Sequence, residues 1–275
     1  MFVTAKLLEV PHAFSTREGG VSHGPFASLN LGHSVGDEAG HVAENARRFA
    51  ACLGLTAGQL ASANQVHGDR VIEIFGAADA GDLMPAPAGE ADGLMTKARG
   101  VAACVRTADC VPILVHAPDV GAVAAIHAGW RGTVAGIAGK AVGALAEKYG
   151  AEPRNIVAAV GPHIRACCYE VSDEVALQFV ARFGERITRK IDGRLGTNGG
   201  DHGIDYVGAT GRSPFPGAWM LDLAEANRRC LEEAGVGRER IEILEECTCC
   251  DAGRFFSHRR DRGRTGRQLS AIRLL

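Results

Sequence analysis

The middle of the chain constrains the fold most, because three short apolar segments follow one another there with brief interruptions. The segments are residues 101–105, 111–115 and 122–126; each is rich in β-branched residues or alanine, and Asp, Pro and Gly separate them. Runs of this length and composition are typical of strands that are buried on both faces of a sheet. We therefore expect closely spaced, doubly covered strands at the centre of the protein.

Helical and strand patterns surround this centre. Helical spacing of apolar residues predicts helices over residues 37–53, 133–149, 172–183 and 222–234. Short apolar runs predict further strands over residues 71–75, 156–160, 241–244, 254–257 and 269–274. This mixture belongs to the α/β or α+β class. Because no Pro- or Ser-rich linker divides the chain, we expect a single domain over residues 1–275.

One stretch differs from the rest. Residues 188–217 contain many glycines together with Pro214 and Pro216, and they show little periodicity. Such a composition indicates a long loop or surface insertion. We expect it to contribute little to the core and nothing to catalysis.

Charge and composition exclude several classes of protein. The 30 Lys and Arg residues nearly balance the 32 Asp and Glu residues, which argues against nucleic-acid and membrane-surface partners. No apolar run approaches the roughly 18 residues of a membrane span, and the first ten residues do not resemble a signal peptide. We therefore expect a cytoplasmic protein. Its nine cysteines are then buried, metal-bound or catalytic rather than a disulfide framework.

Three residues at strand ends could hold a metal. The common nucleotide and hydrolase motifs are absent, but His67 precedes a predicted strand, Cys110 lies between two buried strands and His127 ends the next one. Two imidazoles and a thiolate suit Zn²⁺ and leave a fourth position for water or substrate, although copper accepts the same donor atoms. The residues alone leave a second interpretation open, namely a buried cysteine and two hydrogen-bonded histidines.

A family resemblance favours the metal. The chain resembles the YfiH-like laccase-domain family, with its CNF/YfiH-like fold, in the segments TREGGVS (16–22), NQVHGDRV (64–71), ADGLMT (91–96), RTADCVPILV (106–115), IHAGWRGT (126–133), GPHIRACCYEV (161–171) and FFSHRRDRGRTGR (255–267). The family was once called multicopper polyphenol oxidases and is now described as purine nucleoside phosphorylases with adenosine deaminase activity. The resemblance implies a layered α/β domain whose mixed β-sheets are flanked by helices. It also implies that His67, Cys110 and His127 bind zinc, and that purine nucleosides and phosphate are the partners.

Four further residues are candidates for the same site. Asp109 beside Cys110 either orients a water or acts as general base, or it is a turn residue that binds nearby backbone N–H groups. Arg48 matches an arginine-bearing helix of the family, and Arg17 and Arg131 lie in two of the resembling segments. A guanidinium is well suited to holding phosphate. For Arg48 and its neighbour Arg47 the alternative is a pair of solvated arginines, and for Arg131 it is the capping of strands or the binding of a carboxylate.

Other polar residues are interpreted without a catalytic role. We expect His163 to be a surface or pocket-rim histidine, and the basic run over residues 258–267 to be a solvated loop. Five cysteines lie close to one another in two short segments. They are interpreted as buried thiols, because the Cys-Thr-Cys-Cys segment lacks a partner with the spacing of a structural zinc site: Cys167, Cys168, Cys247, Cys249 and Cys250.

The expected function is zinc-dependent purine nucleoside phosphorolysis of inosine, adenosine or guanosine, with adenosine deamination at the same site. Two alternatives remain open. The first is a cysteine hydrolase with Cys110 as nucleophile and His127 as base. The second is a non-catalytic, zinc-stabilised interaction protein. A true multicopper oxidase is disfavoured, because the ten histidines include no H-x-H pair. The preferred purine, the dominant activity and the oligomeric state do not follow from the sequence.

Overall fold

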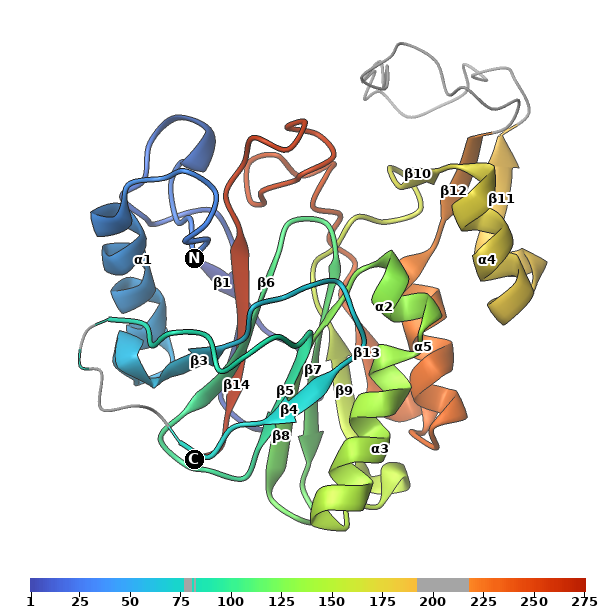
Figure 1. Cartoon of the computed structure of the whole chain (residues 1–275), viewed down its shortest axis with the longest axis horizontal. Coiled ribbons are helices and arrows are strands. Elements are labelled where there is room, and N and C mark those ends of the chain that lie inside the picture. Colours follow the sequence, from blue (N-terminus) through green and yellow to red (C-terminus); the bar gives the residue numbers. More distant parts are fainter. Residues whose placement is uncertain (77–80, 82, 192–217) are drawn as a thin grey trace.

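Two stacked β-sheets lie between helices in a computed structural model that describes residues 1–76, 81, 83–191 and 218–275 (Figure 1). The first sheet has the order β1 (Phe2–Val3), β2 (His12–Ser15), β14 (Gln268–Arg273), β6 (Ala102–Thr107) and β3 (Leu60–Ser62). The second has the order β13 (Ile241–Ile243), β9 (Val157–Val160), β7 (Val111–Ala117), β8 (Ala122–Ala128), β5 (Gly93–Thr96) and β4 (Val71–Glu73). Both sheets mix parallel and antiparallel pairs.

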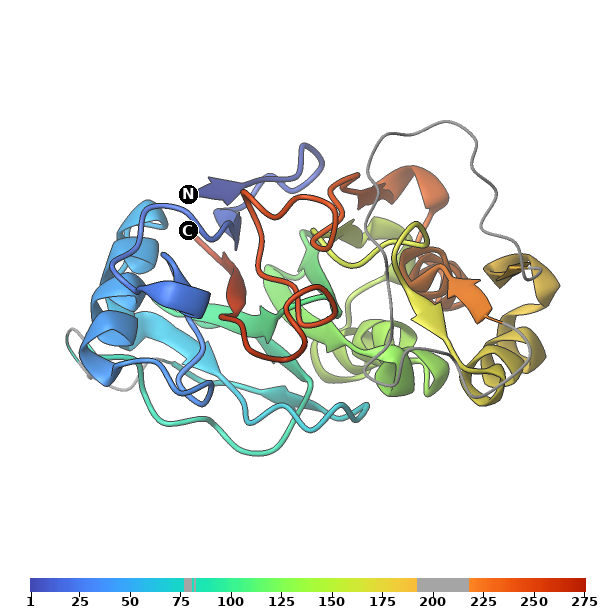
Figure 2. The same ribbon diagram turned by 90° about the horizontal axis from the view of Figure 1, so that it is seen from above.

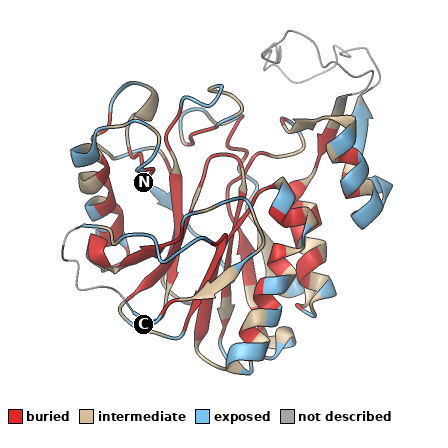
Figure 3. Ribbon diagram, in the orientation of Figure 1, coloured by how far each residue is buried: buried red, intermediate tan, exposed pale blue. Residues whose placement is uncertain are grey.

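Alternating side chains of the central strands explain the layers. In β6, Ala102 and Cys104 pack toward helix α1 (Ala39–Cys52), whereas Ala103 and Val105 pack toward the second sheet. Since successive side chains of a strand point to opposite faces, both faces of the strand must be covered. The predicted doubly buried strands are confirmed: β6, β7 and β8 are buried along nearly their whole length (Figure 3).

Helices cover the two outer faces. Helix α1 packs on the first sheet, and α3 (Ile137–Tyr149) and α5 (Leu223–Glu233) pack on the second, as the view from above shows (Figure 2). The expected mixed sheets flanked by helices are therefore present. Short 3₁₀ helices connect the elements at Gly24–Phe26, Ala57–Gln59, Pro153–Asn155, Glu185–Ile187 and Arg238–Arg240. None of the helices in the described ranges has the length and apolarity needed to cross a bilayer.

The predicted helix over residues 133–149 is two helices. Helix α2 (Trp130–Val134) ends before Gly136, whose φ of 78° lies in the left-handed region, and α3 begins directly after it. A left-handed residue cannot continue a right-handed helix, and glycine adopts that conformation without steric cost. Thr133, the first residue of the predicted range, therefore lies inside α2.

Two helix starts are confirmed by their caps. The Ser172 hydroxyl accepts a hydrogen bond from the Val175 amide at the start of α4 (Asp173–Phe183). The Asp222 carboxylate accepts one from the Glu225 amide at the start of α5. Each cap satisfies a backbone donor that has no partner within its helix.

The predicted strand over residues 254–257 is wrong, because Arg254 ends a turn and residues 255–257 form an irregular segment. Phe255 and Phe256 are fully buried, as their apolar character requires. The Arg260 guanidinium, however, donates to the carbonyls of Phe255 and Thr248. The side chain thus satisfies backbone acceptors that a neighbouring strand would otherwise bind.

The predicted loop over residues 188–217 is wrong at its start. Strand β11 (Thr188–Ile191) pairs antiparallel with β12 (Ala218–Leu221), which also pairs with β10 (Glu170–Val171) to complete a small third sheet. Strand β11 has only four residues, and its partner β12 lies beyond the Gly-rich stretch, so residues 188–191 show no periodicity that predicts a strand. The remainder, residues 192–217, lies outside the described residues.

Candidate metal centre

Strand register brings the three predicted ligands to one edge of the second sheet. Strands β7 and β8 pair so that Val111 lies opposite Ala128 and Pro112 opposite His127, which places Cys110 beside His127. Strand β4 pairs parallel with β5, and β5 pairs with β8. The segment before β4, which carries His67, therefore reaches the same edge.

The three side chains converge. The ligand atoms of His67, Cys110 and His127 all lie within 4.8 Å of one another, and the two imidazole rings meet edge to face with centroids 4.8 Å apart. His127 is buried, Cys110 is half-buried and His67 is exposed. Burial thus decreases across the group, and the group opens to solvent on the His67 side. A catalytic zinc needs three protein ligands and such an open position.

Asp92 orients this group, and it was not singled out from the sequence. Its carboxylate is fully buried and accepts a hydrogen bond of 2.7 Å from His127 Nδ1. The same carboxylate accepts the backbone N–H groups of Val66, His67 and Gly68. One side chain therefore fixes both the His127 ring and the turn that carries His67. Metal-ligating histidines commonly donate their second ring nitrogen to such a carboxylate.

Cys110 and His127 form a thiolate–imidazolium pair. Burial by itself raises the pKa of the Cys110 thiol, but the charge of His127 and hydrogen bonds from His127 and His67 outweigh it and lower this pKa to about 6. Burial likewise disfavours charged His127, yet the Cys110 charge and the Asp92 hydrogen bond raise its pKa to about 9. The thiolate is the form of cysteine that binds metals and attacks electrophiles.

Backbone geometry keeps space beside the ligands. His67 and Asp109 have φ angles of 58° and 89°, a backbone conformation that residues other than glycine rarely adopt. Such strain concentrates at functional sites. A methyl group placed on Gly129 would lie 3.0 Å from His67 and 3.4 Å from the Cys110 sulfur. Glycine thus leaves open the position that faces the ligands. The donor set and this space together fit a zinc ion.

The zinc affinity of the metal-free centre should rise about tenfold per pH unit between roughly pH 7 and 8.5. Above its pKa of about 6, Cys110 is already a thiolate, whereas His127 keeps its proton up to about pH 9. Zinc must therefore displace one proton in this range, so binding tightens as the pH increases. Competition against a chelator of known affinity at several pH values measures the slope. An affinity that does not change with pH would contradict the imidazolium form.

Asp109 has both carboxylate oxygens occupied. Oδ1 accepts from the Thr248 hydroxyl at 2.7 Å, and Oδ2 accepts from the Arg259 amide at 2.6 Å. Asp109 therefore ties the Cys110 turn to the segment after β13. These partners lie far along the chain, unlike the nearby backbone groups expected for a simple turn residue. Its role as a base or water-orienting group stays a prediction.

Three arginines act electrostatically on the centre. Arg259 lies over the half-buried Tyr169 ring at 5.3 Å, and the charges of Arg259 and Arg131 oppose the rise in the Tyr169 pKa that burial and Cys110 produce. The charges of Cys110 and Asp109 likewise act on Arg267. The run over residues 258–267 is therefore only partly solvated. Thr248, Tyr169, Arg259 and Arg267 were missed as site residues; all but Thr248 lie in segments that carried the resemblance.

Arg17 and Arg48 bind elsewhere. Arg17 donates to the carbonyls of Ala27 and Ala252, and Arg48 pairs with Glu44 and donates to the carbonyl of Gly19. Neither has a hydrogen bond to the three ligands within the described part of the chain. Their role in phosphate binding stays a prediction.

A cavity of about 360 Å³ adjoins α1 and does not include the three ligands. Its lining residues include Asp37, Val42, Met84 and Arg106. This cavity is therefore not the opening beside His67.

Two expectations outside the centre are wrong. His163 is buried rather than on the surface, because its Nδ1 pairs with the Gly161 carbonyl inside the fold. The cysteines near residues 167 and 247 are not all buried thiols, because Cys167 and Cys250 are exposed. They also have partners, since the sulfurs of Cys167, Cys168, Cys247 and Cys250 lie within 4.8 Å of one another. Two loops about 80 positions apart in the chain meet there, which no local spacing indicates.

Comparison with known proteins identifies the family of this chain. The family model described as multi-copper polyphenol oxidoreductase laccase matches residues 11–275. The chain is 39% identical to purine nucleoside phosphorylase YlmD of Geobacillus stearothermophilus, over 94% of this chain and 88% of that protein. It is 37% identical to adenosine deaminase RL5 from an unknown prokaryotic organism, over 98% of this chain and 95% of that protein.

A solved structure has the same fold. The crystal structure of the Bacillus licheniformis hypothetical protein YfiH superposes with a TM-score of 0.81 at 32% identity, covering 96% of this chain and 92% of that one. Both the sequence match and this superposition span nearly the whole chain. The chain therefore belongs to the multi-copper polyphenol oxidoreductase laccase family.

Proposed function

We propose that this protein is a zinc-dependent purine nucleoside phosphorylase that also deaminates adenosine. The substrates are inosine, adenosine or guanosine with phosphate, and the products are the free base and ribose 1-phosphate. The observation that carries the proposal is the open set of three converging metal ligands, with arginines around it: Arg267 interacts with Cys110, and Arg131 and Arg259 act on the neighbouring Tyr169. A purely structural zinc site has no need of an open position or of nearby anion-binding groups.

The arginines are assigned to phosphate. Cleavage of the N-glycosidic bond develops positive charge on the ribose, so a phosphate held against C1′ both stabilises that charge and attacks the carbon. Arg131, Arg259 and Arg267 interact electrostatically with Cys110, Asp109 or Tyr169. Arg131 is exposed and therefore available to an incoming anion. We place the phosphate near these three rather than near Arg48, whose guanidinium is engaged by Glu44.

The metal ligands are assigned to the reaction at the purine base. A bound zinc ion would act as a Lewis acid, or activate a water for deamination. Asp92 holds the His127 ring in the orientation that turns Nε2 toward Cys110. Asp109 holds the Cys110 turn against Thr248 and Arg259, so we assign it a positioning role. The related protein named adenosine deaminase RL5 supports the second activity.

A cysteine hydrolase is the second candidate, because Cys110, His127 and Asp92 form a hydrogen-bonded series. A lowered thiol pKa beside a histidine that is oriented by a carboxylate is the arrangement of an activated nucleophile. His67 distinguishes the two candidates, since a second imidazole against the same sulfur is typical of a metal site. The variants at Cys110 discussed below separate them.

The protein should release hypoxanthine from inosine only when phosphate is present. Arg131→Ala should retain zinc and lower kcat/KM for phosphate about 10- to 100-fold, since a charged hydrogen bond is worth about 1.5–3 kcal/mol. Arg154→Ala is the matched control, because Arg154 is exposed and pairs with Glu152. Base release, ribose 1-phosphate and zinc content are measured together. If zinc-loaded protein releases no base from any of the three nucleosides, the proposal is wrong.

A further inference from the structure

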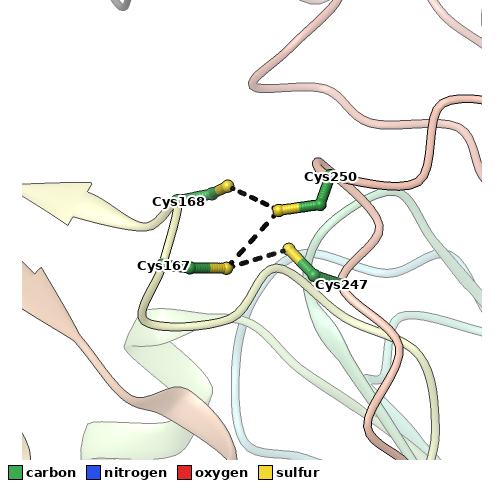
Figure 4. A group of neighbouring side chains, drawn as sticks. All are labelled: Cys167, Cys168, Cys247 and Cys250. Atoms are coloured by element: carbon green, nitrogen blue, oxygen red, sulfur yellow. Dashed lines mark hydrogen bonds between the residues drawn. The ribbon is translucent and has the colours of Figure 1, made fainter. Parts of the chain in front are cut away.

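Five cysteines meet outside the candidate metal centre. Cys167 and Cys168 lie in the loop before β10, and Cys247, Cys249 and Cys250 lie in the loop after β13 (Figure 4). Cys247 and Cys250 have the C-x-x-C spacing that recurs in structural zinc sites. The adjacent pair Cys167 and Cys168 supplies the second half of a four-sulfur set.

The sulfur positions fit a single ion. The Cys167 sulfur lies 3.6 Å from those of Cys247 and Cys250, and the Cys168 sulfur lies 3.3 Å from that of Cys250. Four thiolates at about 2.3 Å from a tetrahedral zinc are separated by roughly 3.8 Å from one another. All four sulfurs also lie within 4.8 Å of one another. This spacing fits one metal ion at the centre of the group.

The surroundings favour thiolate ligands. The Cys247 sulfur accepts hydrogen bonds from the Cys168 thiol and from the backbone N–H groups of Arg165, Cys250 and Cys249. Ile164 and Cys249 pack beside the sulfurs as a small apolar cluster. These hydrogen-bond donors stabilise a negative charge on the Cys247 sulfur, and the thiolate is the form of cysteine that binds a metal.

We propose that Cys167, Cys168, Cys247 and Cys250 bind a second, structural zinc ion that joins the two loops. Among the described residues no cysteine forms a disulfide, and the sulfur contacts connect Cys167 to two partners rather than pairing the residues two by two. Four protein ligands close the coordination shell, so this ion has no open position for a substrate.

The ion would stabilise the candidate metal centre indirectly, through the loop after β13. Thr248, which donates to Asp109, stands directly after the ligand Cys247. Arg260 donates to the carbonyl of Thr248, which ties the following turn to the same segment. An ion that holds this loop against Cys167 and Cys168 would therefore also hold Thr248 in place against Asp109, next to Cys110.

The experiment isolates the second site without altering its cysteines. Cys110→Ala, purified with reductant and excess zinc, should retain one zinc ion per chain. Its zinc X-ray absorption spectrum should show four sulfur neighbours at about 2.3 Å. In otherwise wild-type protein, Cys167→Ser combined with Cys250→Ser should lose one zinc equivalent. Cys52→Ser, at an exposed cysteine outside both groups, is the matched control and should lose none.

Three results would overturn the proposal. The first is a Cys110→Ala protein that stays folded but binds no zinc. The second is a spectrum with nitrogen or oxygen neighbours in place of sulfur. The third is a reductant-treated protein with a mass two daltons low, showing a disulfide within the group. None of these results bears on phosphorolysis, so the two proposals fail separately.

Discussion

Cys110→Ala should lose the zinc of the candidate metal centre and its phosphorolytic activity together. The substitution removes one of three converging ligands, and two ligands hold zinc far more weakly than three. Because metal-ion catalysis is worth several kcal/mol, kcat/KM should fall by about a thousandfold or more. Zinc content and base release from inosine are measured on the same preparation, with Cys52→Ser as control.

A cysteine hydrolase makes the opposite forecast. Cys110→Ala would then lose activity with its zinc content unchanged, and iodoacetamide would inactivate the zinc-loaded wild type. Cys110→Asp sharpens the comparison, because a carboxylate of similar size binds zinc but cannot replace a thiolate nucleophile. Recovery of zinc and of part of the activity in Cys110→Asp supports a ligand role. An inactive, fully zinc-loaded Cys110→Asp protein argues for the nucleophile.

Two of the three ligands of the candidate metal centre can be predicted to be neighbours from the local sequence. Residues 111–115 and 122–126 are recognisable as strands joined by a short turn, and an antiparallel pair of this kind places the residue before the first beside the end of the second. Cys110 and His127 are therefore expected neighbours. His67 is different, because it reaches the site through the parallel pairing of β4 with β5. Parallel partners are not adjacent in sequence, so the place of His67 before a predicted strand made it a candidate, and only the family resemblance indicated that it joins the other two.

Groups that act through backbone contacts were not predictable. The Asp92 carboxylate acts by accepting hydrogen bonds from three backbone amides of a distant turn. Such contacts leave no periodicity in the sequence. The same holds for the segment over residues 254–257, where two phenylalanines indicate a strand but Arg260 satisfies the carbonyls. The cysteine group joins two irregular loops, so neither half of it shows the spacing of a complete site.

The Asp92→Asn substitution should weaken zinc binding and destabilise the fold at once. An asparagine presents one acceptor oxygen where the carboxylate has two, and both carboxylate oxygens are used. In one orientation the His127 Nδ1 proton loses its acceptor, which favours the tautomer with a proton on the ligating nitrogen. In the other orientation the Val66 and Gly68 amides face an NH₂ group. Each unsatisfied buried donor costs about 1–3 kcal/mol.

Two measurements separate the effects of Asp92→Asn. Zinc affinity should fall about 10- to 100-fold, as for other carboxylates that orient metal-bound histidines. Urea unfolding of the metal-free protein should show a loss of about 2–5 kcal/mol. Asp37→Asn is the matched control, because Asp37 is also buried and accepts hydrogen bonds from Ser22, Asn30 and the Glu38 amide. That variant should lose stability while its zinc affinity stays unchanged. Equal zinc affinities in the two variants would show that Asp92 supports the fold but does not orient His127 for the metal.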